Sequence, residues 1–78
     1  MSEEFIRDFY GKILGKLEDQ GNKIIARDFY GKILGTYDKN EDKTRDFYGR
    51  ILSNGNTLSA LIVQTAVENG ETTLRERW

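Results

Sequence analysis

The sequence predicts an all-β fold, a meander of three or four tandem β-hairpins arranged as petals around a pseudo-symmetry axis. A repeat is the first observation behind this: Arg-Asp-Phe-Tyr-Gly-Lys-Ile-Leu-Gly stands at 7–15 and returns unchanged at 27–35. A third copy at 45–53 differs only in Arg50 and Ser53. The second observation is that each copy has the Asp-x-x-Gly spacing of a short hairpin loop.

The repeated unit predicts a three-residue loop, Phe9-Tyr10-Gly11, with Asp8 opposite Lys12. We expect Asp8 to accept hydrogen bonds from loop amides and Gly11 to adopt positive φ, which glycine does without steric cost. A helix would instead hold glycines four residues apart, at about 1 kcal/mol each. The corresponding turn residues of the other copies are Asp28, Gly31, Asp46 and Gly49.

These loops place hairpins at about 3–18, 23–38 and 43–53 of a single domain, 1–78, joined by polar turns at 19–22, 38–42 and 54–56. Pairing residues outward from each loop predicts that both faces of the hairpins carry apolar side chains. One face is expected to hold Ile6, Leu14, Ala26, Leu34 and Leu52. The other is expected to hold Phe5, Ile13, Leu17, Ile25, Ile33, Tyr37 and Ile51.

The last third of the chain supports two interpretations. Asn69-Gly70 between β-branched residues favours a degenerate fourth hairpin at about 60–78. The glycines of the four loops would then be spaced by 20, 18 and 21 residues. The alternative is a helix at about 58–69, because Leu58, Leu61, Ile62 and Ala66 have helical spacing and Gly70 could end it.

Composition excludes several kinds of chemistry. The 78 residues include 12 Lys+Arg and 13 Asp+Glu, a net charge of -1, and no Cys, His or Pro. Disulfides, Cys or His metal sites and Ser-His-Asp triads are therefore impossible, and we expect no enzyme, cofactor or metal. The balanced charge makes nucleic acid an unlikely partner. Without a signal or membrane segment, we expect a cytoplasmic protein.

Aromatic pairs at the loop tips are the main candidate binding residues. The flanking arginines combine positive charge with these aromatic groups, as sites for single-stranded nucleic acid do. The aspartates are explained by turn capping. The aromatic residues could instead pack as core or against another copy of the chain. The candidate binding residues are Phe9, Tyr10, Phe29, Tyr30, Phe47, Tyr48, Arg7, Arg27 and Arg45.

The units at 7–14, 27–34 and 45–52 resemble those of small bacterial β-flower proteins, particularly the five-fold type. This resemblance covers about residues 3–57 and implies short hairpins radiating as petals around an axis. It implies no established activity, cofactor or partner.

Function is expected to be non-catalytic. A core this small, without a disulfide or a structural metal ion, favours a structural or protein-interaction module that self-associates as a homo-oligomer. The alternative is a small module that binds carbohydrate or single-stranded nucleic acid through the aromatic tips.

Overall fold

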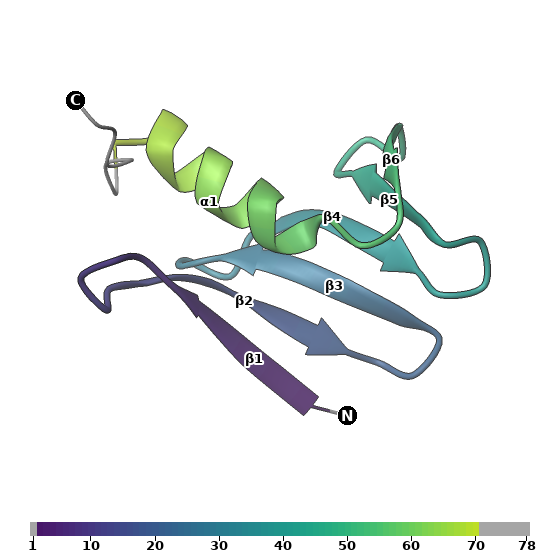
Figure 1. The fold of residues 1–78 in the computed structure, drawn as a ribbon, viewed down its shortest axis with the longest axis horizontal. Coiled ribbons are helices and arrows are strands. Elements are labelled where there is room, and N and C mark those ends of the chain that lie inside the picture. Colours follow the sequence, from purple (N-terminus) through teal and green to yellow (C-terminus); the bar gives the residue numbers. More distant parts are fainter. Residues whose placement is uncertain (1, 71–78) are drawn as a thin grey trace.

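The computed structural model describes residues 2–70 and contains a single six-stranded antiparallel sheet with one helix against it (Figure 1). The strands pair in chain order, so three hairpins lie side by side as a meander. The strands are β1 (Ser2–Arg7), β2 (Ile13–Asp19), β3 (Lys23–Asp28), β4 (Ile33–Asp38), β5 (Lys43–Asp46) and β6 (Ile51–Asn54). The helix is α1 (Leu58–Glu68). The prediction of a mostly β hairpin meander is confirmed.

The repeated unit forms the predicted loop. In the first copy, the amide of Asp8 donates to the carbonyl of Lys12 at 2.9 Å, and the amide of Gly11 donates to the carbonyl of Asp8 at 3.0 Å. Both bonds recur in the other two copies. The three loop glycines have φ of 87°, 90° and 86°, which confirms the predicted positive φ.

A β-bulge directly after each loop changes which side chains share a face. In the first hairpin Arg7 pairs with Ile13 and Ile6 pairs with Gly15, so Leu14 is the additional residue of β2. The sequence prediction, which paired residues without a bulge, was therefore wrong about the faces beyond this point. Leu17 and Tyr37 pack in the same cluster as Leu14, rather than on the opposite face.

The last third is the helix, and the preferred prediction of a fourth hairpin was wrong. Leu58, Ile62 and Ala66 are buried, as the alternative interpretation of their spacing predicted. Asn69 and Gly70 end the helix instead of forming a hairpin loop: Gly70 has φ of 74° and its amide donates to the carbonyl of Val67. The remainder of the predicted fourth hairpin, 71–78, lies outside the described residues.

The core lies between α1 and one face of the sheet. The helix crosses β2, β3 and β4 (Figure 1) and covers a cluster of Leu14, Leu17 and Ala26. Thr44 of β5 is also buried, and its hydroxyl donates to the carbonyl of Gly55 at 2.6 Å and accepts from the amide of Thr57 at 3.1 Å. Leu58, Ile62 and Ala66 are buried against this face of the sheet, which explains why the segment is helical despite its Asn-Gly dipeptide.

Two glycines permit this close packing. A β-carbon on Gly15 would lie 2.3 Å from the carbonyl oxygen of Arg27 and 2.9 Å from Cγ2 of Ile62. A β-carbon on Gly35 would lie 2.5 Å from the carbonyl oxygen of Arg45 and 2.8 Å from Cδ2 of Leu61. Within their own hairpins, Gly15 pairs with Ile6 and Gly35 pairs with Ala26.

The sheet is open. Strands β1 and β6 are its two edges, and no strand pairing joins them within residues 2–70. The hairpins therefore pair with one another along one sheet. In the described part of the chain, no helix is long and apolar enough to cross a membrane.

Candidate interaction surface

Each hairpin tip is fixed by its aspartate. Oδ1 of Asp8 accepts from the amides of Tyr10 and Lys12, at 2.8 and 2.9 Å. Asp28 and Asp46 hold their own loops in the same way, with bonds of 2.8 to 2.9 Å. The predicted role of the three aspartates as turn caps is confirmed.

The arginine before each aspartate bonds across the base of the same loop. Nη1 of Arg7 donates to the carbonyl of Gly11 at 3.1 Å, and Arg27 and Arg45 repeat this bond to Gly31 and Gly49 at 2.8 and 2.9 Å. The aspartate and the arginine together bond two amides and one carbonyl of the loop and its base. The tip is thereby held in one shape before any partner arrives.

The aromatic side chains at the tips are exposed. The three tyrosines have exposed fractions of 69%, 78% and 78%, and in each loop the phenylalanine meets its tyrosine edge to face, with ring centroids 5.3 to 5.4 Å apart. The interpretation that these residues form core within the chain was therefore wrong. Exposed aromatic groups in a fixed geometry are typical of contact surfaces.

The phenylalanines are not equally exposed. Phe9 has an exposed fraction of 82%, compared with 56% for Phe29 and 57% for Phe47. The difference follows the order of the strands, because the second and third tips each have a preceding hairpin beside them and the first has none.

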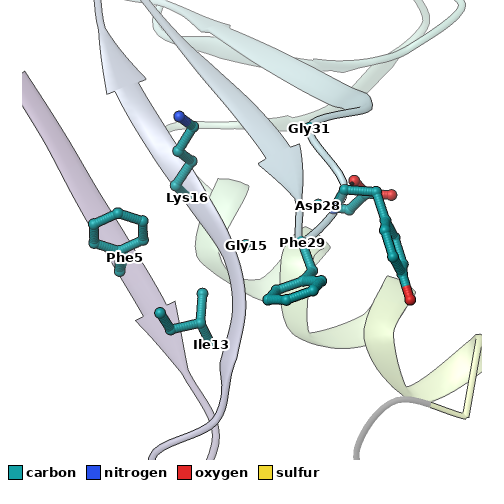
Figure 2. Close-up of a pocket in the computed structure, with 8 residues that line it drawn as sticks. Phe5, Ile13, Gly15, Lys16, Asp28, Phe29 and Gly31 are labelled. Carbon is teal, nitrogen blue, oxygen red and sulfur yellow. Dashed lines mark hydrogen bonds between the residues drawn. The ribbon is translucent and has the colours of Figure 1, made fainter.

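A shallow depression of about 300 Å³ lies where the second tip meets the first hairpin. Figure 2 shows the backbone at Gly15 between the side chains of Phe5 and Ile13 on one side and Phe29 on the other. Sequence analysis did not select Phe5, Ile13, Gly15 or Lys16 as binding residues. The paired register of adjacent copies could have indicated this juxtaposition, since Gly15 pairs with Asp28, which precedes Phe29.

Each tip joins an odd-numbered strand to the next one, so the three tips are at the same end of their hairpins in the meander. Figure 1 shows the first two tips near each other and the tip between β5 and β6 apart from them. The tips fan out rather than form a straight row, since neighbouring strands of a twisted sheet rotate by about 20–25°. The charged side chains of this end include six cations and three aspartates: Arg7, Lys12, Arg27, Lys32, Arg45, Arg50, Asp8, Asp28 and Asp46. Acidic residues outnumber basic ones over the rest of residues 2–70.

Ion pairs join the first two hairpins. Glu18 accepts from Nε of Arg27 at 2.9 Å and lies 3.2 Å from Nζ of Lys16. The Arg27 guanidinium, with Lys16 in addition, lowers the pKa of the Glu18 carboxyl. Hydrogen bonds to Glu3 and Glu18 raise the pKa of Lys16. The Glu18–Arg27 pair links β2 to β3, whereas Lys16 and both of its partners belong to the first hairpin.

Among residues 2–70, no group of three or more acidic side chains is placed to hold a metal ion. Comparison with family models, curated proteins and solved structures found no match to this chain. The function must therefore be argued from the tips themselves.

Proposed function

We propose that this chain is a non-catalytic protein-interaction module that self-associates through its aromatic tips. One observation carries the proposal: six aromatic side chains, each more than half exposed, stand at the same end of their hairpins on three loops of the same geometry. The resemblance to β-flower proteins stays a prediction and adds no function to it.

The loop geometry favours binding because little freedom remains to be lost. Each loop is closed by two bonds to its aspartate and one from its arginine. Phenylalanine and tyrosine have few rotatable bonds, so ordering them at an interface costs little. Aromatic residues held in this way are the type that dominates binding energy at interfaces.

Charge supports a second copy as the partner. The tip end has an excess of cations, whereas the rest of residues 2–70 has an excess of acidic groups. Two copies can therefore attract each other when the tips of one approach the acidic turns of the other. This attraction weakens as salt screens the exposed charges.

Sedimentation equilibrium of the full chain tests the proposal. We expect the mass of the wild type to rise above one chain as its concentration increases. A triple variant, Tyr10→Ser, Tyr30→Ser and Tyr48→Ser, should remain monomeric because it lacks the tyrosine rings. Its loops should keep their shape, because the Asp bonds at these positions involve backbone amides. A matched control, Ser59→Ala, Ala60→Ser and Gln64→Ala at exposed positions of α1, away from both the tips and the turns, should behave as the wild type. A wild type of one-chain mass at every concentration would contradict the proposal.

Single-stranded nucleic acid or carbohydrate is a second candidate ligand. The observation that favours it is the placement of cations beside the aromatic groups, such as the Arg50 guanidinium 5.4 Å from the ring centroid of Tyr48. Retention on single-stranded DNA, heparin or immobilised polysaccharide at low salt, lost in the triple tyrosine variant, would support it. Equal retention of the variant would contradict a role for the tips.

A further inference from the structure

We propose that β1, together with Phe9, is a docking edge for one extended segment of another protein, with the pattern Ile-Leu-Gly-x-(Leu/Tyr)-acidic. The segment would add antiparallel to β1 as a seventh strand. This inference rests on the proposed function of an interaction module, but it concerns a different surface, the edge of the sheet.

The template is the way the hairpins already pair with each other. In the first junction Gly15 pairs with Asp28 and Leu17 with Ala26. In the second junction Gly35 pairs with Asp46 and Tyr37 with Thr44. Both junctions thus place a strand of the pattern Ile-Leu-Gly-x-(Leu/Tyr)-acidic beside the first strand of the next hairpin, in one register.

The glycine in this pattern is required by the close approach of the strands. At both junctions a β-carbon would come within 2.5 Å of a carbonyl oxygen of the next strand. The third copy has Ser53 at the equivalent position, on β6, and its hydroxyl lies 2.7 Å from that of Thr57. A further strand therefore cannot come as close to β6, which is the last strand of the sheet.

At the other edge, β1 has the features that accept such a strand. Five of its six residues are exposed, and only Ile6 is partly buried. Phe9 is 82% exposed, whereas the corresponding residues, Phe29 and Phe47, follow hairpins that precede them and are 56% and 57% exposed. A segment paired with β1 would cover Phe9 as the preceding hairpins cover the other two.

Charge complementarity selects the acidic end of the segment. Arg27 bonds to the carbonyl of Gly31 and also to Glu18, which the preceding hairpin supplies. Arg7 makes the corresponding bond to Gly11, and within residues 2–70 it forms no ion pair. An acidic residue three positions after the glycine of a docked segment would occupy the place that Glu18 occupies beside Arg27.

The occupant is a different protein rather than a second copy. Strands β2 and β4 carry the glycine but are paired on both sides. Strand β6 is at an edge but carries Ser53. In the described part of the chain, no free strand therefore has the pattern that β1 accepts.

The test is titration of the ¹⁵N-labelled full chain with a synthetic peptide of residues 12–19, followed by amide chemical shifts. We expect saturable shifts concentrated in Ser2–Arg7 and at Phe9. The same peptide with Gly15→Ser should bind at least tenfold more weakly. Phe9→Ser in the protein should weaken binding, whereas Phe47→Ser, at the tip farthest along the sheet from β1, should leave it unchanged.

Equal binding of the two peptides, shifts located away from β1, or no binding would overturn the inference. So would shifts of the β1 amides that depend on protein concentration without peptide, since a second copy would then occupy the edge. The triple tyrosine variant separates the two proposals. It should lose self-association and still bind the peptide through β1.

Discussion

Replacement of Gly15 by alanine should destabilise the protein strongly, although its backbone is not in the left-handed region. The added methyl would lie 2.3 Å from the carbonyl oxygen of Arg27 and 2.9 Å from Cγ2 of Ile62. The first neighbour is backbone of the paired strand and cannot move without disturbing the β2–β3 ladder. The second belongs to α1, so the helix would have to shift as well.

The magnitude follows from these two contacts. Overpacking of a core costs about 1–3 kcal/mol, and a lost strand hydrogen bond costs about 1 kcal/mol more. We therefore expect a loss of about 2–4 kcal/mol in the free energy of unfolding. A small domain has only 5–15 kcal/mol in total, so this variant should be clearly less stable.

Urea denaturation followed by circular dichroism measures the loss. Gly11→Ala is the matched control, because a β-carbon there meets nothing within 4 Å and the cost arises only from φ of 87°. That strain is about 1–2 kcal/mol, so Gly15→Ala should be the more damaging change. If Gly15→Ala is as stable as the wild type, or more stable than Gly11→Ala, the close approach of strand and helix is refuted.

Three further predictions follow from the same contacts. Gly31→Val should cost about 1–3 kcal/mol through strain at φ of 90°, measured by thermal melting, and an unchanged melting temperature would contradict the loop. Thr44→Val should cost about 1–3 kcal/mol in urea denaturation, because the carbonyl of Gly55 and the amide of Thr57 lose their buried partner; Thr36→Val, on the more exposed β4, should cost less. Acid should weaken the Glu18–Arg27 pair. The pKa of Glu18 is lowered by Arg27, so its stabilisation is complete above the ordinary value of 4.5 and is lost as pH falls through the folded value. As the pH falls below 4.5, the urea midpoint of Glu18→Gln should therefore decrease less than that of the wild type. An equal decrease in both proteins would contradict this assignment.

The hairpin loops could be predicted because their determinants are local. Asp8 and Gly11 act on amides and φ values within their own loop, so the same prediction succeeded in all three copies. The exchange of faces could not be predicted by pairing residues one to one. It depends on the bulge at Leu14, whose side chain enters the core beneath α1.

The C-terminal helix shows the opposite case. Asn69-Gly70 is locally a strong hairpin signal, yet the segment before it is helical because Leu58, Ile62 and Ala66 cover an apolar sheet face. That face is assembled from strands distant in the sequence. Exposure of the tips was equally hidden from the sequence, since it depends on all three loops projecting beyond the sheet.

The most direct test of the central claim, that the aromatic tips are the surface through which this chain associates, is an amide chemical-shift map at rising protein concentration. We predict that, from micromolar to millimolar protein, the largest changes occur at Tyr10, Tyr30 and Tyr48 and in the residues beside them. A spectrum that does not change, or changes confined to the outer face of α1 around Ala60 and Gln64, would contradict the account.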